Sequence, residues 1–250
     1  MSQRSFFGAA VVGLVLLVSQ AVAKSPVVQA VAKPPVVVEL FTSQGCSSCP
    51  PAEAFLNDLT TRPDIVALEY HVDYWDYIGW KDPFGRREYT KRQQAYSESL
   101  GGRYVYTPQM VINGAAHEVG SKRDAIERLI QDQQTESSPD APELRLTRTD
   151  DSIVVNLSGP APLRPLDVVF IAFDGRHETK VTRGENSGQT LVNAHVVRGL
   201  ERLGQWSGGP AAFTVELKGR KGDGGCAVIV QASSHGPIAA AAMVNFSAAQ

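Results

Sequence analysis

The segment Val36–Pro51 places the strongest constraint on what this chain can fold into. It begins as a run of β-branched and apolar residues, which predicts a buried strand. It continues through a polar turn that carries two cysteines, Cys46 and Cys49. Pro50 and Pro51 suit the first turn of a helix, where the missing N–H group has no partner to lose. The segment therefore predicts a strand, a CxxC turn and a helix that begins at about Pro50 or Pro51.

Two cysteines at the start of a helix favour thiol–disulfide chemistry. The helix dipole and the free backbone N–H groups at a helix N-terminus stabilise a thiolate. The same pair is compatible with a structural staple or with half of a zinc site. A zinc site needs further ligands, however, and the sequence has no second CxxC motif and no HxxxH motif. The strand-to-helix setting favours redox chemistry over both alternatives.

Residues 1–23 have the composition of a secretory signal peptide. Arg4 precedes a short apolar block, and the Ala-Val-Ala of residues 21–23 provides an A-x-A cleavage site. The block is too short to span a bilayer. We therefore expect an exported protein, periplasmic or secreted, with no membrane attachment after cleavage. Residues 24–35 are expected to form a leader into the first strand.

The charge balance and the cysteine count limit the possible partners and scaffolds. The chain has 24 basic and 26 acidic residues, so loss of Arg4 with the signal peptide leaves 23 against 26, a net charge of −3. This balance does not favour nucleic acid or an anionic membrane as a partner. Three cysteines are too few for a disulfide scaffold. In an oxidising compartment Cys46 and Cys49 are expected to pair, whereas Cys226 lies in an apolar strand pattern typical of a buried, inert thiol.

The order of elements after the CxxC helix gives the first domain its predicted fold. The predicted elements are a strand over Asp64–Val72, a helix over Arg86–Leu100, a strand over Thr107–Ile112, a hairpin turn at Asn113-Gly114 and a helix from Ser121. This order, with the CxxC turn, resembles the thioredoxin-like superfamily over residues 36–136. Thr107-Pro108 at the start of a strand is a second match. The resemblance implies that Pro108 is cis and lies against the CxxC pair, next to the substrate.

The chain also departs from that superfamily and resembles a second, narrower family. Gly45 stands where a tryptophan precedes the first cysteine in thioredoxins, and Ser47-Ser48 separates the two cysteines. The strings Phe-Thr-Ser-Gln-Gly-Cys-Ser-Ser-Cys-Pro-Pro at residues 41–51 and His-Val-Asp-Tyr-Trp-Asp at residues 71–76 are similar to hallmark strings of domain-of-unknown-function family 1223. This resemblance to a family of exported bacterial proteins covers nearly the whole mature chain. It implies a fold more than an activity.

The second half of the chain has the pattern of a β-rich domain. Residues 137–142 are rich in Ser, Pro and Asp, which indicates a linker, and a period of two follows over residues 143–250. Asp174-Gly175 indicates a hairpin, and residues 183–188 are interpreted as a polar loop. The predicted fold class is therefore an α/β thioredoxin-like domain followed by a β-rich, antiparallel sandwich-like C-terminal domain.

The predicted chemistry centres on the cysteine pair. Cys46, nearer the turn, is expected to attack, and Cys49 is expected to resolve the mixed disulfide. Glu39 interrupts an apolar strand in which an ionised carboxylate is costly. The resemblance to thioredoxins implies that Glu39 relays the proton of Cys49, although its spacing leaves open that it points away and forms a structural pair. The same resemblance gives Thr107 and Pro108 supporting roles.

The segment after the second strand carries aromatic residues and a histidine. Tyr74, Trp75 and Trp80 are candidates for the wall of a substrate groove, or for packing of the loop onto the domain. His71 together with the two cysteines would make a copper or zinc site, but a hydrogen-bonded structural histidine is the simpler interpretation. No cofactor and no metal ligand set is assigned.

Three functions follow from these features. The first is an exported thiol–disulfide oxidoreductase that acts on protein or small-molecule thiols and disulfides through Cys46 and Cys49, with a separate redox partner. The second is a copper- or zinc-binding protein. The third is a non-catalytic binding protein in which the disulfide is a staple. The sequence does not indicate the direction of electron flow or the substrate.

Overall fold

The computed structural model describes residues 27–29, 34–136 and 140–246. The predicted signal peptide, residues 1–23, lies outside these ranges, as do parts of the predicted leader and linker. Residues 27–29 of the leader form a short strand that pairs antiparallel with residues 146–148. Within the described residues, no helix has the length and apolar character needed to cross a membrane.

Strands make up most of the regular structure. The helices are α1 (Pro50–Leu59), α2 (Arg87–Ser99) and α3 (Arg123–Thr135), with one turn of 3-10 helix, η1 (Asp76–Ile78). The strands are β1 (Val27–Gln29), β2 (Val36–Thr42), β3 (Ile65–His71), β4 (Gln109–Ile112), β5 (Ala116–Val119), β6 (Glu143–Arg148), β7 (Ser152–Ser158), β8 (Leu166–Lys180), β9 (Thr190–Trp206), β10 (Ala211–Glu216), β11 (Gly225–Ala232) and β12 (Ile238–Asn245).

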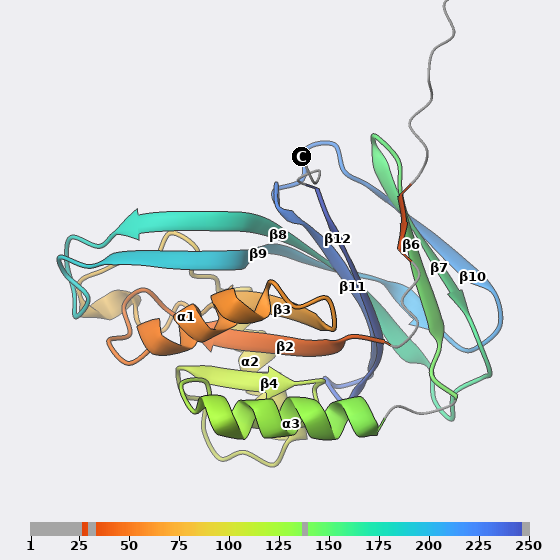
Figure 1. Ribbon diagram of the computed structural model, residues 1–250, viewed down its shortest axis with the longest axis horizontal. Coiled ribbons are helices and arrows are strands. Elements are labelled where there is room, and N and C mark those ends of the chain that lie inside the picture. The colour runs from red at the N-terminus through yellow and green to blue at the C-terminus, as the bar shows by residue number, and fades with distance from the viewer. Residues whose placement is uncertain (1–26, 30–33, 137–139, 247–250) are drawn as a thin grey trace, which may run out of the picture.

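One mixed sheet passes through both halves of the described chain (Figure 1). Its eight strands in the described ranges lie in the order β12-β11-β8-β9-β3-β2-β4-β5, and a second sheet has the order β1-β6-β7-β10. The halves meet where β3 runs parallel to β9, with Glu69 opposite Val196. The predicted α/β thioredoxin-like domain followed by a β-rich domain is therefore wrong. The described chain is mostly β, and strands from both predicted domains share one large sheet.

The length of β8 explains why the two halves join. The hairpin predicted at Asp174-Gly175 is absent from the described structure, because β8 continues through these residues to Lys180 and pairs with β9 along its length. The close approach in this region depends on Gly224, because a Cβ atom there would lie 2.2 Å from the Gly175 nitrogen. A Cβ atom on Gly175 would only reach ordinary contact, 3.5 Å from the Gly224 Cα atom. The actual turn of the hairpin spans residues 181–189.

Alternation along β2 distributes its side chains between two cores. Val38 and Leu40 pack with α1 and α3, which lie on one face of the sheet. Val37 and Phe41 pack on the opposite face, in a cluster that also contains residues of α2, β8, β9 and β11. A third cluster fills the space between the two sheets. The second of these cores thus belongs to both halves of the chain.

Several local predictions are confirmed. The first helix begins at Pro50, directly after Cys49. Asn113 and Gly114 lie in the three-residue turn between β4 and β5, with positive φ angles of 48° and 62°, and the Ala115 N–H donates to the Ile112 carbonyl oxygen at 2.9 Å. Cys226 is a free, fully buried thiol on β11. These features are local in sequence, and the longer-range ones are where the prediction failed.

A shared sheet predicts a single cooperative unfolding transition. Trp75 and Trp80 lie in the first half and Trp206 in the second, so tryptophan fluorescence can report on each half separately. Trp206→Phe and the double variant Trp75→Phe/Trp80→Phe are each expected to show denaturant midpoints that coincide with far-UV circular dichroism of the same variant. Separate midpoints for the fluorescence of one half and the circular dichroism would contradict the shared core.

Candidate functional site

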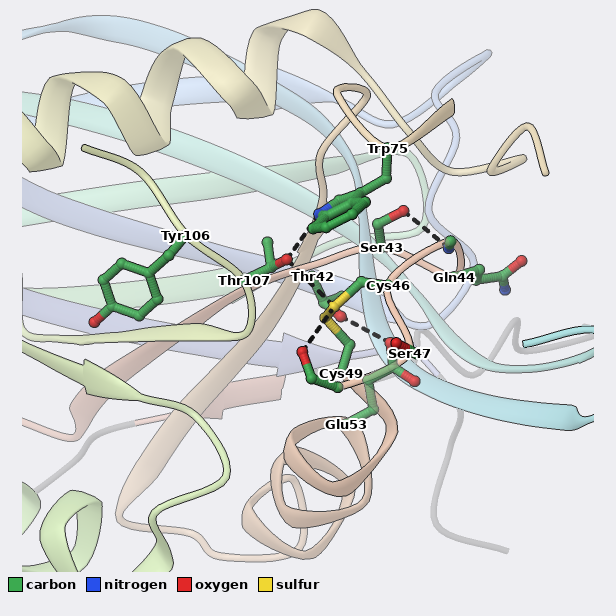
Figure 2. Close-up of a disulfide and its surroundings, with 12 residues drawn as sticks. Thr42, Ser43, Gln44, Cys46, Ser47, Cys49, Glu53, Trp75, Tyr106 and Thr107 are labelled. Carbon is green, nitrogen blue, oxygen red and sulfur yellow. Dashed lines mark hydrogen bonds between the residues drawn. A yellow bond between two sulfur atoms is a disulfide. The ribbon is translucent and has the colours of Figure 1, made fainter. Parts of the chain in front are cut away.

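Cys46 and Cys49 form a disulfide in the turn between β2 and α1 (Figure 2). Their Cα atoms are 5.5 Å apart. Ser47 and Ser48, between them, are exposed, but the cysteines themselves are buried, with 1% of Cys46 and 0% of Cys49 accessible. The predicted position of the pair at the helix start is confirmed. Cys46 is almost as buried as Cys49, because residues from outside the turn cover it.

Thr107 and Trp75 form part of this cover. The Thr107 hydroxyl donates a hydrogen bond to Cys46 Sγ at 3.3 Å, and Trp75 Nε1 donates to Thr107 Oγ1 at 2.8 Å. The Ser48 hydroxyl lies 3.4 Å from the same sulfur. The Thr107–Pro108 peptide bond is cis, as predicted. Sequence reasoning therefore brought Thr107, Pro108 and Trp75 to the right part of the molecule.

The other two predicted groove residues face different partners. The Tyr74 hydroxyl donates to Gln93 Oε1 on α2 at 3.1 Å, and burial raises the pKa of Tyr74 to about 12. Trp80 Nε1 donates to Gln44 Oε1 at 3.2 Å. Both residues thus fasten the loop to its surroundings, which was the alternative interpretation. Tyr77, on η1, is 82% exposed.

Gln44 holds the turn from several sides. Its backbone N–H donates to Asp82 Oδ2 at 2.7 Å, and its side-chain Nε2 donates to Asn193 Oδ1 at 3.0 Å. Its carbonyl oxygen accepts a bond from Asn186 Nδ2 at 2.9 Å. Asn186 and Asn193 come from the second half of the chain, so that half completes the site. The sequence interpretation of residues 183–188 as an ordinary polar loop missed this contact.

Glu53 is a buried acid beneath the disulfide that sequence reasoning also missed. It lies one helical turn after Cys49, so the two side chains share one face of α1. Only 2% of it is exposed, and the Thr42 hydroxyl donates to its Oε1 at 2.7 Å (Figure 2). Burial, and secondarily the charge of Glu69, raises the pKa of Glu53 to about 8. This carboxyl group therefore exchanges its proton near neutral pH.

A second buried group extends from Glu53 into the sheet. His71 Nδ1 lies 2.8 Å from Asp82 Oδ2, and its Nε2 lies 3.5 Å from Glu69 Oε1. Burial alone lowers the pKa of His71, but the charges and hydrogen bonds of Asp82 and Glu69 outweigh it and raise that pKa well above its usual value. His71 is thus an imidazolium between two carboxylates. Among the described residues no group of His, Cys, Asp and Glu side chains is placed to hold a metal ion.

Glu39 lies on the opposite face of the sheet from α1. Its carboxylate accepts from Arg92 Nε at 2.8 Å and from the hydroxyl of Tyr96, both on α2. Arg92 Nη2 also donates to Gln231 Oε1 on β11 at 3.2 Å. The predicted relay of the Cys49 proton through Glu39 has no support in this position, since alternation along β2 points its side chain away from α1. Glu39 belongs to a structural ion pair, the alternative left open by its spacing.

The comparisons with known proteins fix the family and the fold. Residues 37–231 match the family described as "Protein of unknown function (DUF1223)". The X-ray structure of protein AGR_C_4864 from Agrobacterium tumefaciens is similar with a TM-score of 0.76 and 32% sequence identity, over 88% of this chain and 98% of that one. HBP35 of Porphyromonas gingivalis shares the fold with a TM-score of 0.62 at 14% identity, over 89% and 78% of the two chains. None of the curated proteins matches the sequence.

The ion pair predicts a stability effect without a redox effect. Glu39→Gln is expected to lower the free energy of unfolding by about 3–5 kcal/mol, because the buried guanidinium of Arg92 loses its counter-charge. Denaturant titration measures this loss. As a matched control, Glu127→Gln removes a half-exposed partner of Arg62 and is expected to cost under about 1 kcal/mol. A Glu39→Gln protein of normal stability with slowed thiol exchange would instead support the relay.

Proposed function

This chain belongs to the DUF1223 family, which is described only as proteins of unknown function, and we propose from its site that it is a thiol–disulfide oxidoreductase. Cys46 and Cys49 are the reactive pair, and protein or small-molecule thiols and disulfides are the substrates. The observation that carries the proposal is the position of the disulfide, at a helix start and one helical turn from a buried carboxyl group. That arrangement supplies both a redox pair and a group to move its proton.

A purely structural role is a weak explanation for this disulfide, because the disulfide would add little stability. The two cysteines are three positions apart. In the chain-entropy account, a disulfide stabilises the folded state by restricting the unfolded chain. A ring as small as this one gives about 2 kcal/mol of stabilisation, whereas a ring of 100 residues gives almost 5 kcal/mol. The turn is already held by hydrogen bonds that Gln44 donates to Asp82 and Asn193 and accepts from Asn186. A staple is therefore a weak explanation for a buried cysteine pair beside an ionisable acid.

The exchange proceeds in two steps that balance. The Cys46 thiolate attacks one sulfur of a substrate disulfide, forming a mixed disulfide and releasing the first substrate thiolate, which takes up a proton. Cys49 then loses its proton and attacks the Cys46 sulfur, closing the disulfide and releasing the second substrate thiolate. Two electrons and two protons pass from the protein dithiol to the substrate. The reverse reaction begins with attack of a substrate thiolate on Cys46 and departure of Cys49.

The described residues supply a role at each step. The hydroxyl groups of Thr107 and Ser48 contact the Cys46 sulfur and are placed to hold it as a thiolate. Glu53 takes the proton of Cys49 in the closing step and returns it in the reverse reaction. Residues 1–23 support export, which places the pair in a compartment where disulfides persist. A separate redox partner returns the Cys46–Cys49 pair to its starting oxidation state after each cycle.

Trapping of a mixed disulfide tests the assignment of Cys46 and Cys49. Cys49→Ser is expected to accumulate a mixed disulfide with glutathione at Cys46, whereas Cys46→Ser is expected to form little, because the Thr107 and Ser48 hydroxyl groups contact the Cys46 sulfur and favour its thiolate. Intact-mass analysis and peptide mapping identify the adduct. Cys226→Ser is the control: burial raises the pKa of Cys226 to about 12, so this change should leave exchange unaltered. Equal trapping at all three cysteines would refute the assignment and leave a staple or a metal-binding role.

The role of Glu53 predicts a particular pH dependence. In reduction of the Cys46–Cys49 disulfide by a small dithiol, protonated Glu53 donates to the departing Cys49. The rate, corrected for the thiolate fraction of the reductant, should therefore fall as pH rises through about 8. Glu53→Gln should remove this step and slow the reaction at pH 6–7 by roughly 100-fold, the low end of general acid catalysis, because a thiolate leaves readily. A Glu53→Gln profile identical to that of the wild type would exclude this role.

A further inference from the structure

The tip of the β8–β9 hairpin, residues 181–189 and here called the strap, lies across the turn that carries Cys46. Asn186 is 1% exposed, and its Nδ2 donates to the carbonyl oxygens of Gln44 at 2.9 Å and Cys46 at 3.0 Å. Backbone hydrogen bonds within the strap, Val181 to Gln189 and back from Gly188, fix its shape. The strap is therefore anchored to the backbone of the reactive turn by a side chain from the other half of the chain.

Glu185, next to that anchor, places a carboxylate on the turn itself. The Ser47 backbone N–H donates to Glu185 Oε2 at 3.3 Å. Ser47 is the residue directly after Cys46, so the negative charge is within reach of a thiolate on Cys46. Two like charges about 7 Å apart at a protein surface disfavour each other by roughly half a pKa unit to one unit. Glu185 thus opposes ionisation of the Cys46 thiol.

The start of α1 offers few backbone N–H groups that could stabilise a Cys46 thiolate. Helix N-termini stabilise thiolates through free backbone N–H groups and the dipole. Pro50 and Pro51 have no N–H group, and the N–H of Cys49 is bonded to the Cys46 carbonyl oxygen at 3.2 Å. The N–H group of Ser47 already donates its hydrogen bond to the Glu185 carboxylate. Burial of Cys46 disfavours its charged form as well. The hydroxyl groups of Thr107 and Ser48 are neutral donors, and they offset only part of the effects that disfavour a Cys46 thiolate.

These observations bear on the direction of electron flow. A dithiol becomes a strong oxidant when its thiolate form is stabilised, because that stabilises the reduced state. Here the surroundings of Cys46 withhold that stabilisation. We propose that the strap is a working part of the redox site, in which Asn186 holds Glu185 against the turn and Glu185 keeps the Cys46–Cys49 pair on the reducing side. This inference rests on the proposed function and adds a direction to it.

The reduced protein then acts as a reductant of substrate disulfides. Its dithiol gives two electrons and two protons to the substrate disulfide, which becomes two thiols, while Cys46 and Cys49 close to a disulfide. A thiol or dithiol electron donor must return the pair to the dithiol. Glu185 and Asn186 are positioning residues in this scheme, because they act through the turn and not on the substrate sulfur.

The test compares Glu185→Gln with a matched control in the full chain. Glu178→Gln removes an equally exposed acid from the same hairpin, seven positions away. Two quantities are measured, the pH dependence of Cys46 alkylation by iodoacetamide in the reduced protein and the redox equilibrium with glutathione from pH 7 to 9. Glu185→Gln should lower the pKa of the Cys46 thiol by about half a unit to one unit. Glu178→Gln should leave it unchanged.

The glutathione equilibrium distinguishes an effect on the thiolate from a general change in structure. Above the pKa of Cys46 the Glu185→Gln protein should show a roughly three- to tenfold higher ratio of reduced to oxidised pair than the wild type, and well below that pKa the two should agree. Asn186→Ala should shift the alkylation pKa in the same direction, with little further shift when combined with Glu185→Gln. Higher ionic strength should shrink the Glu185 effect.

Two results would overturn the inference, and a third would overturn the proposed function beneath it. A Glu185→Gln pKa equal to that of the wild type, or a wild-type Cys46 pKa below 7, contradicts the role of the strap while exchange itself remains intact. A reduced Cys49→Ser protein that forms no mixed disulfide at Cys46 when it is mixed with oxidised glutathione contradicts the proposed function itself. The alkylation pKa is measured independently of exchange, so the two failures are distinguishable.

Discussion

The buried carboxylate of Glu69 joins the two halves of this protein. It lies on β3 at the position opposite Val196, where β3 and β9 run parallel. One oxygen accepts from Asn193 Nδ2 at 2.8 Å and the other from the Ala194 N–H at 3.1 Å, both on β9. Asn193 in turn accepts from Gln44 in the reactive turn. The contact that closes the large sheet is therefore also the contact that brings the strap over the disulfide.

Burying so many charges in one place requires that they balance. Glu69 and Asp82 lie on either side of His71, whose pKa is raised well above its usual value, so two carboxylates share one imidazolium. Glu53 is the third acid of the group, and burial together with the Glu69 charge keeps it protonated until about pH 8. The same cluster that fastens the sheet thus leaves one carboxyl group able to exchange a proton beneath the cysteine pair.

The parts of this structure that the sequence predicts are those that a few neighbouring residues determine. Pro50 after Cys49 sets the helix start, and Asn113-Gly114 sets a hairpin, because each depends on backbone angles within a few residues. Asp174-Gly175 has the same local pattern but lies in mid-strand, because β8 pairs with β9 both before and after it, at Asp174 and at Arg176. The pairing of β3 with β9 and the reach of Asn186 to the turn depend on residues more than 100 positions apart, which no local pattern carries.

Glu39 and Glu53 show the same limit at the scale of one side chain. Glu39 stood out because it interrupts an apolar strand, yet strand alternation directs it to Arg92 on the far face. Glu53 lies in the first turn of α1, where an acid is common, and therefore did not stand out. Its spacing of one helical turn from Cys49 was the available clue. The acid that can exchange a proton with the dithiol is therefore determined by which face of its strand or helix each side chain occupies.

The central claim is that Cys46 and Cys49 pass electrons to a substrate disulfide. The most direct measurement is a single-turnover reaction of the reduced wild-type protein with a disulfide-containing peptide, followed by mass spectrometry of both partners. The account predicts a protein that has lost two hydrogen atoms, with the disulfide mapped to Cys46–Cys49, and a peptide that has gained two free thiols. A protein that keeps its thiols, or one left as an unresolved adduct at Cys46 with Cys49 intact, would contradict it.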